Sequence, residues 1–317
     1  MKKLISLLFI FLILSITLTI AAQSTNIGLI TEVENPAVPS YNKAVESVLK
    51  ALESGGNFNS NFLKTELLTD YLPKLSYLAA DQADLIVAIG PSMQQSVKET
   101  AQLYSEKDFL IIDGRVELDN VLSIDFAVEE GAFLAGVIAA LKSESDVIAF
   151  IGERENNRSK KFEAGFAAGA KELKPEIKLL SEYLSRSKQN NTARERTDQL
   201  YYAGADVIFY YSGSASEAIV ASAEENDFYL IGVQNKLAEP VSDKLLTNII
   251  KNIPYLLEKE SNNFANNNHQ SGFKTYDLAN SGLMIDQDTA DKMLAESILD
   301  KVELYKNKLI NGAVEIP

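Results

Sequence analysis

The sequence contains no cysteine and a single histidine, His269. The absence of cysteine excludes disulfide bonds, thiolate metal sites and cysteine nucleophiles. One histidine cannot form a multi-histidine metal site, and its position in a polar, asparagine-rich loop argues against a Ser–His–Asp triad. The sequence therefore predicts neither a metal centre nor a histidine-based hydrolase.

Basic residues are also few: 30 Lys and Arg stand against 44 Asp and Glu, a formal net charge of −14. This balance argues against a nucleic-acid partner, because binding to phosphates requires positive charge. The sequence has no G-x-S-x-G elbow, no phosphate-binding G-x-x-x-x-G-K-[ST] loop and no G-x-G-x-x-G fingerprint. We expect no cofactor, and the enzyme chemistry left open is a hydrolase that uses carboxylates alone.

The first 22 residues resemble an export signal. Met1, Lys2 and Lys3 are followed by an uncharged, mostly apolar run over residues 4–20 and by the small residues Ala21 and Ala22. This pattern predicts either a cleaved signal peptide or a retained N-terminal anchor over residues 1–22. In both cases the rest of the chain is expected outside the cytoplasm, with this segment as its only contact with the membrane.

The stretch that organises the chain is residues 120–153, which reads as strand, helix and strand. Apolar residues recur at spacings of three and four along the helix, and Glu129 and Glu130 favour the positive end of its dipole. Glycines and alanines keep this helix slim, so that another element can lie close against it. We expect this unit to lead from one α/β lobe to a second, with a ligand cleft between them.

The 317-residue sequence is 46% hydrophobic and 23% charged, and strand and helix patterns alternate along it after the first 22 residues. The alternation predicts an α/β fold with two doubly wound parallel-sheet lobes. Residues 23–126 with 251–270 are expected to form the first lobe, and residues 127–250 with 271–285 the second. Residues 286–310 predict one long terminal helix, and the lobe of residues 286–317 is left open.

In open α/β sheets, ligands bind beyond the carboxyl ends of the strands. The residues near those ends include aromatic, amide and charged side chains, and such a set suits a flat polar ligand. Aromatic rings can stack on the faces of the ligand, and amide and carboxylate groups can form hydrogen bonds with its N–H and O–H groups. The candidate ligand-binding residues are Glu32, Tyr41, Asn42, Ser92, Asp113, Phe126, Tyr211, Gly213, Gln234 and Lys251. Arg158 lies in a loop near them.

Each candidate also has a structural alternative. Tyr41 could cover the lobe surface, and one of the neighbouring Tyr210 and Tyr211 is expected in the core. Asp113 could only cap a turn, and Lys251 could be a surface lysine. Ser212, Gly213 and Ser214 could cradle an anion at a helix N-terminus or form an ordinary turn.

Several segments carry a family resemblance. Residues 129–141 (EEGAFLAGVIAAL), 162–179 (FEAGFAAGAKELKPEIKL), 204–213 (GADVIFYYSG) and 229–233 (YLIGV) resemble segments of the basic membrane protein family. These are the purine nucleoside receptor-like solute-binding proteins of bacterial ABC importers. The resemblance implies a type I periplasmic-binding fold, with two lobes that are joined by a hinge of three crossings and close on a nucleoside.

The resemblance also implies roles for individual residues. Ser40, Tyr41 and Asn42 match the family's S-F-N segment, so Tyr41 takes the place of a base-stacking phenylalanine. Glu32 stands where the family has an aspartate that reads the base. Asp113 matches the acid at the end of I-I-D, Tyr211 falls near a second aromatic, and Lys251 matches a lysine near the sugar.

The sequence departs from the family pattern in its first loop, in a thinner glycine-rich segment after Phe209, in lacking a lipobox cysteine, and at Gln234. There glutamine replaces an aspartate that bonds ribose hydroxyls. Losing a charge-assisted bond costs ~1.5–3 kcal/mol, about tenfold or more in affinity. The ligand is therefore left open between a nucleoside and another small polar planar molecule.

These observations predict a non-enzymatic, extracytoplasmic solute-binding protein that delivers a small ligand to the permease subunits of an ABC importer. The alternative is a membrane-anchored sensory protein of the same fold. The carboxylate-based hydrolase is a more distant alternative.

Overall fold

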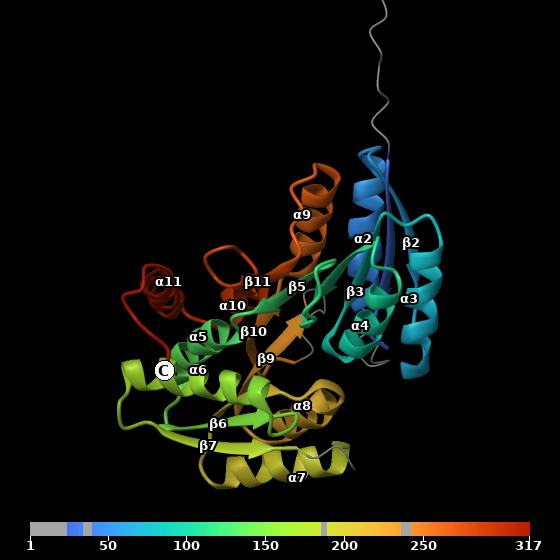
Figure 1. Ribbon diagram of the computed structural model, residues 1–317. Helices are drawn as coiled ribbons and strands as arrows, with labels where there is room; N and C mark the ends of the chain where they lie inside the picture. Colours follow the sequence, from blue (N-terminus) through green and yellow to red (C-terminus); the bar gives the residue numbers. More distant parts are fainter. Residues whose placement is uncertain (1–23, 34–39, 185–188, 236–241) are drawn as a thin grey trace, which may run out of the picture.

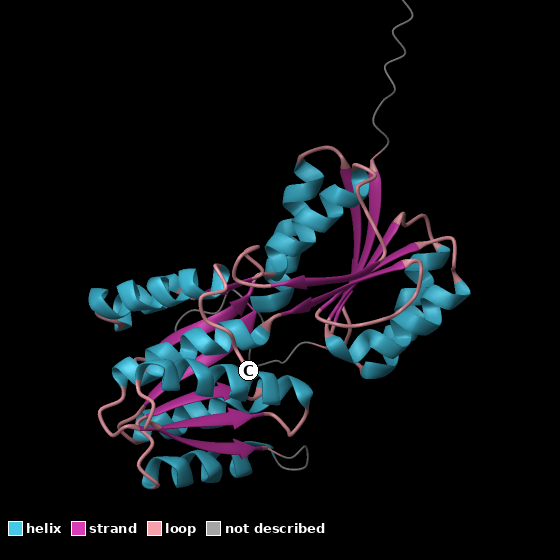
Figure 2. Cartoon of the chain, turned by 60° about the vertical axis from the view of Figure 1, so that its left-hand side comes forward, coloured by secondary structure: helices cyan, strands magenta, loops and turns pink. Residues whose placement is uncertain are grey.

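The computed structural model describes residues 24–33, 40–184, 189–235 and 242–317, which form two α/β lobes (Figure 1). Within these ranges each lobe has a six-stranded sheet with helices on both faces (Figure 2). The fold is the predicted pair of doubly wound sheets, because most residues of the strands inside each sheet are apolar and are buried on both faces.

The first sheet has the strand order β11-β5-β4-β3-β1-β2, and all of its pairings are parallel. Its strands are β1 (Thr25–Thr31), β2 (Phe58–Leu63), β3 (Leu85–Ile89), β4 (Asp108–Ile112), β5 (Val121–Phe126) and β11 (Gly272–Tyr276). The helices of this lobe are α2 (Ser40–Ser54), α3 (Tyr71–Ala80), α4 (Gln94–Leu103) and α9 (Ile253–Ala265), which packs against α2.

The second sheet repeats this layout in the order β12-β10-β9-β8-β6-β7, with only the β10–β12 pair antiparallel. Its strands are β6 (Val147–Gly152), β7 (Lys178–Tyr183), β8 (Val207–Tyr211), β9 (Tyr229–Asn235), β10 (Leu245–Lys251) and β12 (Leu283–Ile285). Its helices are α5 (Val128–Lys142), α6 (Asn157–Leu173), α7 (Gln189–Tyr202), α8 (Ser216–Glu225), α10 (Gln287–Met293) and α11 (Glu296–Ile310).

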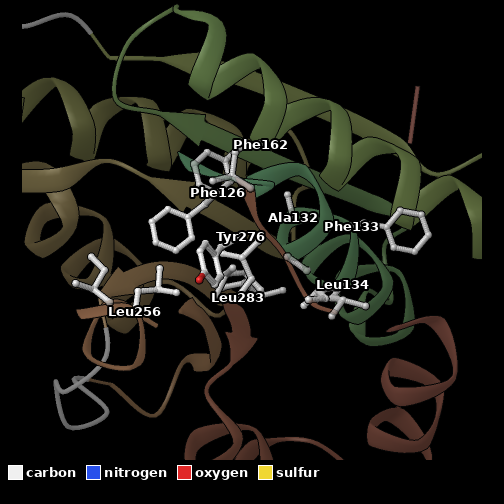
Figure 3. Packing of buried hydrophobic residues seen from close by; sticks show 14 of the residues in the cluster. Phe126, Ala132, Phe133, Leu134, Phe162, Leu256, Tyr276 and Leu283 are labelled. Carbon is white, nitrogen blue, oxygen red and sulfur yellow. The ribbon is translucent and has the colours of Figure 1, made fainter. Parts of the chain in front are cut away.

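The described chain passes between the lobes three times: from β5 to α5, from β10 to α9, and from β11 to β12. The buried apolar core continues through these crossings. Phe126, Tyr276 and Leu283, which lie at or beside them, belong to one cluster with residues of both sheets (Figure 3). The crossings are therefore packed into a core that the two sheets share.

Helix α5 has apolar or small residues all round and is buried over most of its length. It packs most extensively on α6. A Cβ on Gly136 would come 2.1 Å from the carbonyl oxygen of Phe166, and one on Gly169 would come 1.9 Å from that of Phe133. Backbone therefore lies on backbone, and the expected close approach to a slim helix is made by α6.

Two sequence expectations about the end of the chain were wrong. Residues 271–285 were assigned to the second lobe, but β11 pairs with β5 in the first sheet and only β12 joins the second. The single terminal helix is split into α10 and α11, because Leu294 and Ala295 are extended and the Leu294 side chain is buried. Both helices belong to the second lobe, where α10 packs on β10 and α11 on α5.

Candidate functional site

The site is centred on Asp113, which follows β4 at its carboxyl end. Its backbone has a φ of 66° in the left-handed region, which aspartate tolerates better than most residues, and its N–H donates to the carbonyl of Ile124 at 2.8 Å. The carboxylate accepts from Lys251 Nζ at 2.8 Å and from Arg158 Nη1 at 2.7 Å. Asp113 therefore joins two cations of the second lobe.

Lys251 is the last residue of β10 and lies at the second crossing. Its side chain is only 5% exposed, so it is a buried lysine and not a surface one. Its ammonium lies 5.6 Å from the ring centroid of Phe126 and 6.0 Å from that of Tyr211, within the range of cation–π attraction. Besides Asp113, two aromatic rings thus surround this charge.

Arg158 enters the site from the first turn of α6. The side chain of Asn156 caps this helix by accepting from the N–H of Ser159 at 2.9 Å. Burial by itself would lower the pKa of Arg158, but Asp113, Tyr211 and Asp125 outweigh it and raise the pKa, so the guanidinium stays charged. Asp125, on β5, lies 3.5 Å from Nη2.

Glu32 follows β1 and is half-buried above Gly90, whose position would not accept a side chain: a Cβ there would come 2.0 Å from Cγ of Glu32. The carboxylate accepts from both the backbone N–H and the hydroxyl of Ser92. Burial raises the pKa of Glu32, partly offset by the Ser92 hydrogen bonds, and the nearby charge of Asp113 raises it further. Glu32 and Ser92 thus form one unit beside Asp113.

The remaining described candidates have different environments. Asn42 is buried, and its side-chain oxygen accepts from the hydroxyl of Thr31 at 2.7 Å, which ties α2 to β1. Phe126 is buried in the core beside the site. Gly213 is exposed with a φ of 55°, and its carbonyl accepts from Ser216.

The two neighbouring tyrosines separate as expected. Tyr210 is in the core, where burial raises its pKa to about 12. Tyr211 is half-buried and packs on Phe162, with ring centroids 4.6 Å apart, while its hydroxyl lies within hydrogen-bonding reach of Arg158. Tyr211 is therefore the tyrosine of the site.

For two candidates the structure describes the backbone but not the side chain. The side chains of Tyr41 and Gln234 are not among the described side chains, although the backbone of Gln234 pairs with Ile250 in the second sheet. The predicted stacking by Tyr41 and hydrogen bonding by Gln234 remain predictions.

The structure brings together six of the candidates, namely Glu32, Ser92, Asp113, Phe126, Tyr211 and Lys251. It adds three residues to them: Arg158, Asp125 and Phe162. The sequence places Arg158 near the strand ends but gives it no role in the site. Asp125 could have been suggested by its position, because it is the residue before Phe126, a candidate at the end of the same strand. Phe162 lies inside a helix and carried no signal of its own.

His269 lies away from this group. Its Nε2 is 3.8 Å from the carboxylate of Asp108, at the start of β4, whereas Asp113 follows the end of that strand, roughly 16 Å farther along. In the described parts of the chain, no three His, Asp or Glu side chains lie close enough to hold a metal ion. None of the described helices is long and apolar enough to span a membrane.

Comparisons with solved structures give the fold. A solute-binding protein of an ABC transporter from Aeropyrum pernix matches with a TM-score of 0.74 at 16% identity, over 92% of this chain and 94% of the other. A protein from Bacillus halodurans described as a transcriptional activator of the comK gene matches with a TM-score of 0.76 at 16% identity, over 92% and 99%. The architecture is that of type I periplasmic solute-binding proteins.

Sequence relatives agree over nearly the whole chain. A CD4+ T-cell-stimulating antigen of Listeria monocytogenes is 25% identical over 94% of this chain and 89% of its own. The ABC transporter nucleoside-binding protein BmpA of Lactococcus lactis is 26% identical, over 86% and 84%. Basic membrane protein B of Borrelia garinii is 27% identical, over 88% and 83%.

The sequence profile of one family, described as ABC transporter substrate-binding protein PnrA-like, matches residues 26–317. This match covers both lobes and every residue of the site described above. The chain belongs to this Bmp family of PnrA-like ABC-transporter substrate-binding proteins.

Proposed function

We propose that the protein captures a nucleoside, or a small planar molecule of similar polarity, between its lobes and presents it to the permease subunits of an ABC importer. The observation that carries this proposal is the convergence of charged and aromatic side chains from both lobes around Asp113 and Lys251. The name of the Lactococcus lactis relative, a nucleoside-binding protein, supports the ligand class.

Recognition uses the chemistry of these side chains. The ring of Tyr211, with that of the predicted partner Tyr41, offers a face for a flat ligand. Lys251 and Arg158 offer N–H donors, while Asp113 and Glu32 offer carboxylate oxygens. A ligand with ring nitrogens, carbonyls and hydroxyl groups can satisfy both kinds of partner.

The protein acts outside the cytoplasm in this proposal, where the export-like residues 1–22 would direct it. It binds its ligand without making or breaking a covalent bond. The family supports this, because its description is that of a substrate-binding protein and not of an enzyme.

The test is a thermal-shift screen of the purified protein against nucleosides, nucleobases and sugars, followed by chromatography of the ligand recovered from the same samples. We expect a nucleoside to raise the melting temperature and to be recovered unchanged. No shift with any nucleoside at millimolar concentration would reject the ligand class, and conversion of the ligand would reject binding without turnover.

A further inference from the structure

A cavity of about 340 Å³ lies in the first lobe between α9 and β11. This volume is at the lower end of the range for small-molecule sites, ~300–1,000 Å³. In the described part of the chain, none of the side chains around Asp113 lines the cavity, so it is separate from the site between the lobes. Its lining includes Lys259, Glu260 and Asn263 of α9, Lys274 and Tyr276 of β11, and Asn280 of the segment between β11 and β12.

Glu260 is the one carboxylate of the cavity wall, and its charge is already balanced. The side chain is only 1% exposed, and it accepts from Lys274 Nζ at 2.8 Å. It also accepts from the hydroxyl of Tyr276 at 2.5 Å, which points toward α9 (Figure 3), and from the amide of Asn263 at 3.1 Å. Glu260 and Lys274 therefore form a neutral pair at the base of the cavity.

Lys259 is the second cation of the cavity wall. Its side chain is half-buried, and its ammonium lies 5.3 Å from the ring centroid of Tyr255 and 5.0 Å from that of Tyr276. Among the described residues, no carboxylate lies within ion-pairing distance of it. Positive charge is therefore in excess in this cavity, although the chain as a whole has a formal net charge of −14.

The two tyrosine rings place the ammonium of Lys259 in advance. A ring face attracts a cation, so it restricts the long side chain without using up its strong N–H donors. Lys274 also keeps donors for a further partner, because its ammonium carries three N–H groups. Ordering these groups costs little when a ligand binds, since most of their freedom is already lost.

We propose that this cavity is a second binding site, which takes a small anion of the carboxylate or phosphate type between Lys259 and Lys274. The oxygen atoms of such an anion accept charge-assisted hydrogen bonds from both ammonium groups. The anion supplies the counter-charge that Lys259 lacks in the described protein. A cationic ligand, in contrast, would meet the unmatched charge of Lys259.

The site touches two of the three connections between the lobes. Helix α9 begins where the chain has crossed from β10, and Asn280 lies in the segment that crosses from β11 to β12. The amide of Asn280 donates to the carbonyl of Thr275 at 3.3 Å, and its side-chain oxygen accepts from the N–H of Asp277 at 2.8 Å. A bound anion thus contacts parts of the chain that both crossings position, whatever ligand the lobes hold.

The test is a titration of the purified protein with inorganic phosphate and with succinate at constant ionic strength, which keeps the screening of surface charges the same. The amide NMR signals of α9 and β11 report on the cavity, and their shifts give the dissociation constant. Lys259→Met removes the charge and keeps the apolar stem on the rings. Lys308→Met is the matched control, because Lys308 is also half-buried, 4.3 Å from the ring centroid of Tyr305, but lies on α11 outside the cavity.

We expect saturable shifts with at least one of the two anions, and the anion that binds more tightly identifies the class. Lys259→Met should raise its dissociation constant about tenfold, as for the loss of one charge-assisted bond, and Lys308→Met should leave it unchanged. The proposal is overturned if neither anion gives saturable shifts at millimolar concentration. It is also overturned if Lys259→Met binds as tightly as the parent protein, because the anion then lies elsewhere.

A second variant separates the charge of Lys259 from its shape. Lys259→Arg keeps the positive charge and should still bind the anion. A loss of affinity as large as that of Lys259→Met would show that the charge is not the cause, and would overturn the proposal. None of these measurements uses a ligand of the site around Asp113, so they decide the matter independently of the proposed function.

Discussion

Helix α6 takes part in two contacts of opposite kind. Over Gly165 and Gly169 its backbone lies directly on α5, whereas at Arg158 a long side chain reaches the other lobe through an ion pair. The first contact leaves no room for adjustment, because a single methyl group would collide with backbone atoms. The second is made by the end of a flexible side chain, which can adjust without a collision between backbone atoms. Rigid lobes and an adjustable junction are what a protein needs if it closes on a ligand.

The largest expected effect comes from disturbing the rigid contact. Gly169→Ala places a Cβ 1.9 Å from the carbonyl oxygen of Phe133, so α5 and α6 must separate along their whole seam. We expect a loss of about 3 kcal/mol in the free energy of unfolding, measured with urea. Gly55→Ala, at the exposed end of α2, is the control and should change stability by less than about 0.5 kcal/mol. Equal losses in both variants would contradict the rigid seam.

Removing the charge at the junction comes next. Asp113→Asn leaves Arg158 and the buried Lys251 without their shared carboxylate, which should lower the free energy of unfolding by about 2 kcal/mol. Urea denaturation measures the loss. The control Asp119→Asn, an exposed residue of the same lobe, should be neutral. A neutral result for Asp113→Asn would mean that the pairs contribute no stability.

The ion pair between Glu260 and Lys274 lies within the first lobe and can be compared with the pairs of Asp113, which join the two lobes. Glu260 on α9 is buried, and its carboxylate accepts from Lys274 at 2.8 Å, Tyr276 at 2.5 Å and Asn263 at 3.1 Å. Burial would raise the pKa of Glu260, but these hydrogen bonds outweigh it and lower the pKa. At pH values above the ordinary pKa of glutamate, the charged Glu260 therefore stabilises the fold. This contribution is lost as the pH falls through the lowered pKa of Glu260.

Glu260→Gln should accordingly cost about 1–2 kcal/mol at pH 7, and the difference from the parent should shrink when urea denaturation is repeated in acid. The exposed Glu303→Gln provides the control. A difference that stays constant with pH would show that the charge of Glu260 does not matter.

The smallest effect is expected at Glu32, whose pKa is raised and not lowered, so that its effect on stability changes with pH in the opposite direction to that of Glu260. Because the folded-state pKa of Glu32 is raised, its charged form destabilises the fold at neutral pH, and stability is gained as the pH falls through that value. Glu32→Gln should change stability at pH 7 by less than about 1 kcal/mol and should remove this gain in acid. Urea denaturation of both proteins across the acidic pH range measures this gain in stability. If Glu32→Gln gains as much stability in acid as the parent protein does, a group other than Glu32 is responsible.

The regular parts of the chain could be predicted from the sequence because their signals are local. The spacing of Phe133, Leu134, Val137 and Ile138 predicts α5, and the small residues predict that a neighbour lies close to it. The uninterrupted apolar strands predict parallel sheets that are buried on both faces.

The remaining features depend on contacts between distant residues. Nothing in residues 272–276 indicates that they pair with β5, about 150 residues earlier, so this segment was assigned to the wrong lobe. Arg158 is 45 residues from Asp113, and only the packing of α6 on α5 brings it there. Asp113 could be named from its place at a strand end and Lys251 from the family resemblance, but their pairing could not be predicted.

The central claim is that a small ligand is held between the lobes by the side chains around Asp113. Titration calorimetry of the parent protein and of Asp113→Asn with the ligand found by thermal shift tests it most directly. We predict one ligand per chain and a dissociation constant at least about tenfold higher in Asp113→Asn, the loss of one charge-assisted bond. The same dissociation constant in both proteins would place the ligand elsewhere and contradict the claim.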